Sequence, residues 1–388
     1  MREALIDVTR LLDRTMQGRL PTGVDRVGLE YVSHFRERAT ALVRFAGHWI
    51  ELSPSDSERL FAALLQPDAA FNQLIRRLVA RAATQSLGRR FTIPRFMFNT
   101  GHSGLELVQY VKRLQHSRLR PIFFVHDLIP ITHPEYCRPG ECAKHRLRMN
   151  TVLANGHGVV TNSAQTLAEL AAYGKAGGLP MPPATVALLA PARLPPPAAT
   201  MPVEAPFFVI LGTIEPRKNH WLLLQVWRQL IERLGAGAPR LVVIGQRGWE
   251  CENVVDLLER CEPLRGHVFE QPGCSDAELA WYLQHAQGLL FPSFSEGYGM
   301  PLVEALIHRL PVIASDLSAF REIAGNIPEY LDPLDGKRWR ELIAEYARPE
   351  SMLRAAQIER MKNFTAPTWE AHFEHVETLM ERLRAAAP

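Results

Sequence analysis

"FFVILGTIEPRKNH", residues 207–220, contains the succession of features that decides the fold. The apolar run FFVILG predicts a buried strand, the loop TIEPRKN follows it, and a helix is expected from about Trp221. Outward from this stretch, the same succession returns several times. Further strands are predicted at RLVVIG (240–245), HVFEQ (267–271), GLLFPS (288–293) and PVIASD (311–316). Short apolar strands that alternate with helices are typical of parallel α/β sheets.

The first half of the chain follows the same pattern. Between the halves, the proline-rich segment 192–206 predicts a stiff, exposed connector. We therefore predict an α/β protein with two doubly wound, Rossmann-like domains, 1–197 and 203–365, that face a central cleft. The apolar spacing of 366–388 predicts a terminal helix that crosses back onto the first domain. The strands predicted in the first half are ALIDVT (4–9), RFMFNTG (95–101), PIFFVHD (121–127) and HGVVTNS (157–163).

The composition is that of a globular protein, with 47% hydrophobic and 22% charged residues among 388, a length that favours two domains. We expect no membrane span, because no apolar run reaches 18 residues. Five cysteines without a CxxC pair favour neither a disulfide framework nor a zinc site, and no secretory signal is recognisable, so we expect a cytoplasmic protein. Residues 1–200 contain 25 Lys and Arg against 15 Asp and Glu. This imbalance indicates an anionic partner for the first half; the alternative is chance scatter over its surface.

A second stretch, "FPSFSEGYGMPLVEALIHR" (291–309), places one glutamate before a turn and one in the helix after it. Gly299 and Pro301 suit a loop that approaches a ligand and then opens a helix, whose N-terminus favours an anion such as a diphosphate. Glu304 lies one turn into the helix and leans back, so it can accept hydrogen bonds from ribose hydroxyls. Glu296 would face the other end of the same ligand. The alternative for Glu304 is a local role, because an acidic residue there suits the helix dipole.

Two cations stand side by side in the first stretch. Arg217 and Lys218 follow the first strand of their domain, and in doubly wound sheets the loops at the carboxyl ends of strands line the ligand crevice. There they would neutralise a departing nucleoside diphosphate. The alternative is that both are ordinary solvated surface cations.

These motifs resemble the retaining glycosyltransferases of family 4, which have the GT-B fold. The resemblance covers most of the chain and is strongest over 207–325. FSEGYGMPLVEAL matches the family's pattern of two glutamates around seven residues, and PRKNH matches its diphosphate-binding Arg/Lys motif. The resemblance implies that 1–197 binds the acceptor and 203–365 binds a nucleotide-sugar donor. The donor-facing loops 244–250 and 270–276 have no feature that identifies the base.

The resemblance also implies individual roles. Arg217 and Lys218 would bind the donor's diphosphate. Glu296 would bind donor-sugar hydroxyls and support the developing positive charge, while Glu304 would bind the ribose. In the first half, TGVDRVGLEYV (22–32) and FFVHDLIPITHPE (123–135) look like family segments that face the diphosphate and the donor sugar. The predicted site comprises catalytic Glu296, His126, Arg217 and Lys218; donor-binding Gly299, Met300, Pro301, Glu304 and Gly23; and, on the acceptor side, Arg26, His102 and Asp127.

The expected activity is retaining, metal-independent transfer of a hexose. No Asp-x-Asp pair occurs, so Arg217, Lys218 and the helix N-terminus would do the electrostatic work of a metal. No cofactor is expected, because the nucleotide-sugar is a substrate. The preferred reaction moves mannose from GDP-mannose to a polyprenyl-diphosphate-linked oligosaccharide in exopolysaccharide, capsule or O-antigen synthesis. The alternatives are a UDP-, dTDP- or other GDP-sugar donor, a nucleotide-sugar epimerase, and a non-catalytic nucleotide-sugar binding module. No nucleic-acid partner is expected.

A basic amphipathic helix is predicted within 71–90. Its apolar residues fall on one stripe, and arginines lie off that stripe. Two roles are open for it. The helix could dock reversibly on the anionic inner face of the cell membrane, or its stripe could pack in the core of the first domain. The stripe comprises Phe71, Leu74, Ile75, Leu78, Val79 and Ala82, and the arginines are Arg76, Arg77 and Arg81.

Overall fold

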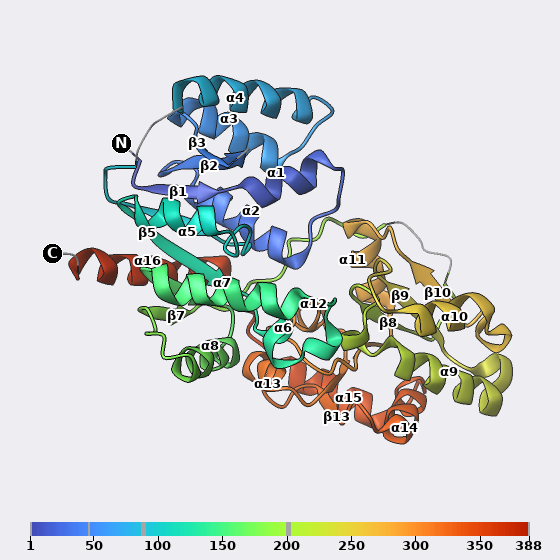
Figure 1. Cartoon of the computed structure of the whole chain (residues 1–388). Helices are drawn as coiled ribbons and strands as arrows, with labels where there is room; N and C mark the ends of the chain where they lie inside the picture. The colour runs from blue at the N-terminus through green and yellow to red at the C-terminus, as the bar shows by residue number, and fades with distance from the viewer. Residues whose placement is uncertain (1, 46, 87–90, 199–202, 387–388) are drawn as a thin grey trace. The chain divides into compact units, whose positions relative to one another are not determined.

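A computed structural model describes residues 2–45, 47–86, 91–198 and 203–386. The chain folds as two compact units (Figure 1). The first unit comprises Met1–Ile131, Cys142–Leu189 and Thr368–Pro388. The second comprises Thr132–Glu141 and Ala190–Pro367, so ten residues from within the first half belong to the second unit. Within the described ranges, no helix combines the length and the apolarity that crossing a membrane requires.

The first unit is built on a seven-stranded sheet of order β3-β2-β1-β4-β5-β6-β7. Every pairing is parallel except that of β3 with β2. The strand order reverses between β1 and β4, as in a doubly wound sheet. Four strands confirm the sequence prediction. The strands are β1 (Ala4–Asp7), β2 (Ala39–Phe45), β3 (His48–Glu51), β4 (Arg95–Asn99), β5 (Leu119–Val125), β6 (Gly158–Thr161) and β7 (Ala184–Val186).

Helices surround this sheet. The last helix of the chain, α16, packs on β6 and β7 (Figure 1). Its buried residues recur at helical spacing from Trp369 to Leu383, which is the apolar pattern that predicted a helix there. The helices are α1 (Thr9–Met16), α2 (Gly23–Phe35), α3 (Pro54–Leu65), α4 (Phe71–Ser86), α5 (Val108–Gln115), α6 (Ile129–Thr132), α7 (Glu141–Asn155), α8 (Ala164–Ala176) and α16 (Trp369–Ala385). The 3-10 turn η1 (Pro134–Tyr136) falls in the segment that belongs to the second unit.

The basic amphipathic helix is α4, and its apolar stripe lies inside the first unit. Phe71, Ile75, Leu78 and Ala82 are each at most 4% exposed, and α4 contacts β3 and α3. Arg76 and Arg77 are exposed. Of the two roles open for this helix, core packing therefore accounts for the stripe, and only the arginine face remains for an anionic surface. Arg89 and Arg90 lie outside the described residues.

The second unit contains a six-stranded, fully parallel sheet of order β10-β9-β8-β11-β12-β13. Numbered within the unit this is 3-2-1-4-5-6, the order of a dinucleotide-binding sheet. The five strands predicted from sequence are confirmed, and the edge strand β13 was not predicted. The strands are β8 (Phe207–Leu211), β9 (Arg240–Ile244), β10 (Val268–Gln271), β11 (Gly288–Phe291), β12 (Val312–Ser315) and β13 (Glu329–Leu331).

Both faces of this sheet are buried. Phe207 and Val209 of β8 belong to one apolar cluster, while Phe208 and Ile210 belong to the other, because alternate residues of a strand point to opposite faces. The helices are α9 (His220–Leu234), α10 (Glu252–Arg260), α11 (Asp276–His285), α12 (Met300–Ile307), α13 (Ser318–Ala324), α14 (Gly336–Tyr346) and α15 (Met352–Met361), with 3-10 turns η2 (Pro216–Lys218), η3 (Gly235–Gly237) and η4 (Glu262–Leu264).

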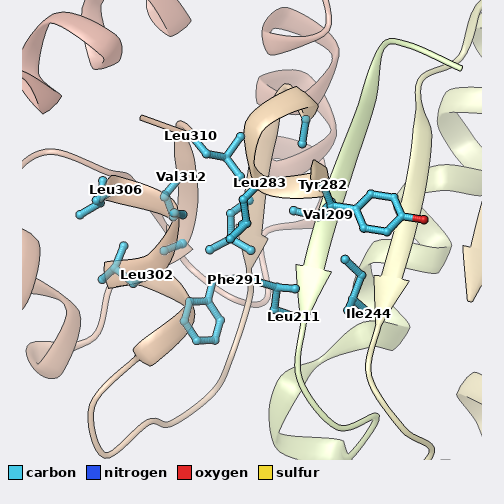
Figure 2. Packing of buried hydrophobic residues seen from close by; sticks show 14 of the residues in the cluster. Val209, Leu211, Ile244, Tyr282, Leu283, Phe291, Leu302, Leu306, Leu310 and Val312 are labelled. Carbon is cyan, nitrogen blue, oxygen red and sulfur yellow. The ribbon is translucent and has the colours of Figure 1, made fainter. Parts of the chain in front are cut away.

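The first of these clusters fixes the start of α12. Figure 2 shows Leu302 and Leu306 of α12 beside Phe291 of β11 and Val312 of β12. These four side chains are at most 2% exposed. The helix is therefore held against two central strands, and its N-terminus stays at their carboxyl ends.

Candidate functional site

The candidate site lies in the second unit, where the strand order reverses between β8 and β11. Ligands of doubly wound sheets bind outside the carboxyl ends of the strands at this point. The loop 212–219 follows β8, and the loop 292–299 follows β11. The two loops are joined where the amide of Phe294 donates a hydrogen bond to the carbonyl of Arg217, at 2.9 Å.

Three residues predicted from sequence meet between these loops. Lys218 Nζ lies 2.7 Å from Glu296 Oε1, and Arg217 Nη1 lies 2.6 Å from Glu296 Oε2. The side chains of Lys218 and Glu296 are each only 9% exposed. Ser293 Oγ also donates to Glu296 Oε1, at 2.7 Å. A buried carboxylate is thus shared by two cations, and we call Arg217, Lys218 and Glu296 the switch-point cluster.

The electrostatics of the cluster follow from burial and pairing. Burial works against the charged form of Glu296, but Arg217 and Lys218 outweigh it and lower the pKa of this carboxyl to about 2. Burial lowers the pKa of Lys218, and the Glu296 carboxylate opposes that shift. Glu215 pairs with Arg217 at 2.6 Å; its pKa is raised because burial outweighs the nearby cations. The arginine is therefore held between two carboxylates.

Local sequence explains how Lys218 becomes buried. The segment Pro216–Lys218 forms a 3-10 turn, and Asn219 ends it in the left-handed region with φ of 57°. Gly212 has φ of +133°, and a Cβ there would lie 3.1 Å from Lys218 Cε. The lysine nitrogen also lies 4.8 Å from the ring centre of Phe291, a favourable cation–π distance. Glycine at 212 thus leaves the space that the lysine stem occupies.

The start of α12 is the second part of the site. Met300 and Pro301 form its first turn, and Gly299 precedes them with φ of +122°. A Cβ at position 299 would lie 2.7 Å from the Phe320 ring, so glycine is required for both reasons. No side chain caps this N-terminus, which leaves its dipole directed at the loop. Glu304 lies in the same helix and is 9% exposed.

The predicted residues of the first unit form a separate group at the carboxyl ends of β4 and β5. His126 Nε2 donates to the carbonyl of Thr100 at 2.6 Å, and its ring centre lies 5.4 Å from that of His102. The carbonyl of Asp127 accepts a hydrogen bond from His145 Nε2 at 3.1 Å. Burial lowers the pKa of His126, and it lowers that of His102 further, so both rings are neutral at pH 7.

Gly23 and Arg26 lie at the start of α2. Thr22 and Asp25 form a capping box there, and Asp25 pairs with Arg10 at 2.9 Å. A Cβ at Gly101, next to the carbonyl that His126 binds, would lie 2.6 Å from Arg10 Cδ. This start of α2 is therefore linked to the histidine group through Asp25 and Arg10. Gly23 itself is exposed, with open space around its Cα.

Several residues of these groups were not predicted from sequence. Glu215 lies in the same loop as Arg217 and Lys218 and comes just before them in the sequence. The available signal was an acidic residue close to two basic ones. Ser293 ends the strand motif GLLFPS, where a polar residue after an apolar run was the signal. His145 lies in α7 and contacts His102 at 5.5 Å between ring centres. Nothing in its sequence context indicates this contact.

Comparisons with known proteins agree with this architecture. HepE from Anabaena, solved with UDP and glucose, superimposes with a TM-score of 0.67 at 16% identity and covers 98% of this chain and 100% of that chain. Sucrose-phosphate synthase from Thermosynechococcus elongatus gives 0.64 at 16% identity and covers 99% of each chain. Two Rossmann-like units with parallel sheets and these structural neighbours define the fold class, which is GT-B. Residues 197–331 match the family model of glycosyl transferases group 1.

Mannosyltransferases are among the similar sequences. The serotype-specific mannosyltransferase WbdA of Escherichia coli is 29% identical over 324 positions, which cover 74% of this chain and 36% of WbdA. The O-antigen chain mannosyltransferase RfbU of Salmonella typhimurium is 34% identical over 161 positions, which cover 41% of this chain and 42% of RfbU. The match thus spans about a third of the length of WbdA.

Proposed function

We propose that the protein is a glycosyltransferase of surface polysaccharide assembly that uses the switch-point cluster to bind a nucleotide-sugar. The observation that carries this proposal is the meeting of Arg217, Lys218 and Glu296 at the strand-order reversal of the second unit. The glycosyl transferase family match over 197–331 includes all three residues. The mannosyltransferase names of the sequence relatives support mannose as the transferred sugar, and GDP-mannose is the donor that we propose.

The proposed chemistry uses the cluster in two ways. The donor diphosphate would lie between Arg217, Lys218 and the start of α12, where two cations and a helix dipole stabilise negative charge. As the bond between the sugar C1 and the phosphate oxygen breaks, the diphosphate gains charge and the sugar becomes cation-like. Glu296 would then bind the sugar hydroxyls and stabilise that positive charge. Glu304, one turn into α12, would accept hydrogen bonds from the ribose.

Retention of configuration is the proposed stereochemistry. An acceptor hydroxyl would attack C1 from the side of the leaving group, and its proton would pass to the departing phosphate oxygen. A new bond forms between C1 and the acceptor oxygen, and the nucleoside diphosphate carries the proton away. This route requires no separate protein base. It also requires no divalent ion, because Arg217 and Lys218 supply the positive charge.

The first unit is proposed to supply the acceptor side. His126 and His102 are neutral, and because the one N–H of His126 is used on the Thr100 carbonyl, its Nδ1 can only accept a hydrogen bond. Together with Asp127, Arg26 and Gly23, they would contact a lipid-linked oligosaccharide and the donor beside it.

The protein would bind the membrane reversibly, through exposed arginines such as Arg76 and Arg77 rather than through the apolar stripe of α4. Co-sedimentation with anionic but not neutral vesicles, lost in Arg76→Glu with Arg77→Glu, is the expected result; equal binding to both vesicles contradicts it.

For the donor, UDP-glucose is the specific alternative to GDP-mannose. HepE, a structural neighbour, was solved with UDP and glucose, which favours UDP-glucose as the alternative donor. Thermal-shift measurements with GDP, UDP, dTDP and their sugars test both. We expect the largest stabilisation from GDP and GDP-mannose. A preference for UDP would replace the donor, and no shift with any nucleotide would contradict the site. Conversion of the nucleotide-sugar without acceptor would indicate an epimerase; binding without turnover would indicate a binding module.

A further inference from the structure

The loop 292–299, which carries Glu296, is attached to Arg217 at three successive residues. The amide of Phe294 donates to the carbonyl of Arg217 at 2.9 Å, and Arg217 Nη1 donates to the carbonyl of Ser295 at 2.8 Å. The same guanidinium nitrogen lies 2.6 Å from Glu296 Oε2. Because Phe294 is only two residues before Glu296, any displacement of Phe294 would also move the carboxylate of the switch-point cluster.

The side chain of Phe294 has little support from the core of the second unit. Two apolar clusters cover the faces of this unit's sheet, and their described members do not include Phe294. The ring is only partly buried, and it lines a pocket of about 290 Å³. Segments with few buried apolar contacts open locally at low cost in free energy. The loop therefore depends on other contacts to stay in place.

Tyr136 provides such a contact. Its ring stacks on that of Phe294, with ring centres 5.2 Å apart and planes 10° apart. Near-parallel rings at this distance are offset, which is a favourable stacked arrangement. His133 stacks on Tyr136 in turn, with ring centres 6.0 Å apart and planes 13° apart. Both residues come from the segment Thr132–Glu141, which belongs to the second unit. A row of three rings thus ends on the loop that carries Glu296.

The backbone around Tyr136 is fixed by contacts that do not use its ring. Trp249 Nε1 donates to the carbonyl of Tyr136 at 3.3 Å, and the amide of Tyr136 donates to the carbonyl of His133 at 3.1 Å. The guanidinium of Arg138 lies 5.1 Å from the centre of the Trp249 ring, a favourable cation–π distance. These contacts persist when the tyrosine ring is removed, so the effect of the ring can be measured separately.

The pairing of Glu296 is sensitive to the position of its loop. Its two carboxylate oxygens contact different cations, Oε1 at 2.7 Å from Lys218 and Oε2 at 2.6 Å from Arg217. Both contacts are short, charge-assisted hydrogen bonds, which weaken when distance or angle changes. The side chains of Lys218 and Glu296 are each only 9% exposed, so water compensates little for a lost contact. A loosened loop would leave a buried cation poorly paired.

We propose that Tyr136 is a positioning residue of the switch-point cluster: its ring holds Phe294, and Phe294 holds the loop so that Glu296 reaches both cations. Tyr136 acts through Phe294 and is assigned no contact with a substrate. The consequence for turnover rests on the proposed function, whereas the consequence for the loop does not.

Hydrogen exchange at pH 7 tests the support of the loop in the full chain without any substrate. The amides of the loop 292–299 should exchange about fivefold faster in Tyr136→Ala, because one stacked aromatic pair is lost. They should exchange at the wild-type rate in Tyr136→Phe, which keeps the ring. Phe294→Leu should accelerate the same loop. Tyr173→Ala is the matched control, because Tyr173 is also a partly exposed tyrosine and lies in α8 of the first unit.

Three results of this measurement would overturn the proposal. The first is loop exchange that is equal in wild type and Tyr136→Ala. The second is equal acceleration in Tyr136→Ala and Tyr136→Phe, since the ring would then not be the group that matters. The third is acceleration throughout the second unit, which would indicate general destabilisation rather than support of one loop.

Transfer kinetics connect the loop to Glu296. In Tyr136→Ala, kcat should fall about fivefold while GDP affinity and the KM for GDP-mannose stay near the wild-type values, because Glu296 is assigned to the sugar. In a Glu296→Gln background the same substitution should have little further effect, since the carboxylate that it positions is gone. Additive losses overturn the proposal. A wild type without transfer activity, whose loop still exchanges faster in Tyr136→Ala, would remove the proposed function and leave the support of the loop by Tyr136 intact.

Discussion

In the cluster of Arg217, Lys218 and Glu296, one carboxylate pairs with both cations before any ligand arrives. Each charge is largely buried, and a buried charge that loses its partner is strongly destabilising. A donor diphosphate would give the two cations a second anionic partner while Glu296 turns to the sugar. On the proposed function, the reaction would redistribute these ion pairs between the diphosphate and the sugar, so single substitutions in the cluster should affect both stability and turnover.

Lys218→Ala tests the cation most directly. Loss of one preorganised charge contact at the diphosphate should lower kcat by about 10²–10³-fold, or roughly 2.7–4 kcal/mol. Steady-state transfer rates with GDP-mannose measure this. Lys362→Ala is the matched control, because Lys362 is an exposed lysine of the same unit that pairs with Glu359 within one helical turn. A Lys218→Ala enzyme with the rate of the control would remove this loop from the site.

Glu296→Gln separates the two ends of the ligand. We expect turnover to fall more than GDP affinity, because Glu296 is assigned to the sugar; equal losses would mean that it contacts the nucleotide.

The stability of the protein gives a second readout for the same substitution. The pKa of Glu296 is depressed from 4.5 to about 2, so the carboxylate contributes stability above pH 4.5 that is lost as pH falls towards 2, roughly 3 kcal/mol in all. Denaturant titrations between pH 5 and 2 should show this loss in the wild type and a smaller one in Glu296→Gln.

At the scale of helices and strands, the sequence predicted those elements whose own residues determine their structure. The strands β8, β9, β11 and β12 were predicted because each is a nearly continuous apolar run, which is typical of a strand buried on both faces. The strands β3, β7 and β13 were missed because their partners, rather than their own residues, make them strands: β7 and β13 have three residues each, and β3 pairs antiparallel at an edge. The strand β2 was also missed, although five of its seven residues are buried. The stripe of α4 predicted an amphipathic helix, but only tertiary structure decided what covers it.

The candidate site shows the same division. Arg217, Lys218, Glu296 and the start of α12 were predictable because a strand followed by a loop places them at the same sheet edge. The ion pairs of Arg217 and Lys218 with Glu296 were not predictable, because Glu296 was assigned to the sugar and the pairing depends on how two loops fold. The stacking of Tyr136 on Phe294 was also missed. The two residues are 158 positions apart in the sequence, and no local pattern connects them.

The terminal helix α16 carries a pH-dependent anchor. His372 is 1% exposed, donates from Nδ1 to the carbonyl of Leu188 at 3.1 Å, and accepts at Nε2 from the hydroxyl of Tyr31 at 3.1 Å. Burial lowers its pKa to about 4. Protonation at Nε2 would remove the acceptor that Tyr31 uses, so acid should weaken the attachment of the helix to the first unit.

His372→Gln tests this anchor, since glutamine can donate and accept but does not titrate. Because the pKa of His372 is depressed from 6.5, the unfolded chain takes up the proton first, and stability falls as pH drops from 6.5 to 4 by roughly 3 kcal/mol. Urea unfolding of the first unit at pH 7, 5.5 and 4.5 should show a shallower fall in the variant. His48→Gln, an exposed histidine of the same unit, serves as the control. Parallel pH profiles for wild type and His372→Gln would contradict the assignment.

At the scale of the whole molecule, each unit contributes a different chemistry. The second unit collects buried charges at its strand-order reversal, as a site for a diphosphate requires. The first unit collects neutral histidines at the carboxyl ends of β4 and β5, which suits hydroxyl groups rather than phosphates. Transfer of a sugar from a charged carrier to a neutral hydroxyl would use both. This division and the family match over 197–331 support the proposed glycosyltransferase activity.

The central claim is that the switch-point cluster transfers a sugar from a nucleotide carrier without a metal. The most direct test incubates the full chain with GDP-mannose labelled in the sugar, octyl α-mannoside as acceptor, and excess EDTA. We expect labelled dimannoside with an α linkage, GDP released in equal amount, and a loss of about 10²-fold or more in Lys218→Ala. Unchanged donor, product that requires added Mn²⁺ or Mg²⁺, or equal transfer by Lys218→Ala would contradict it.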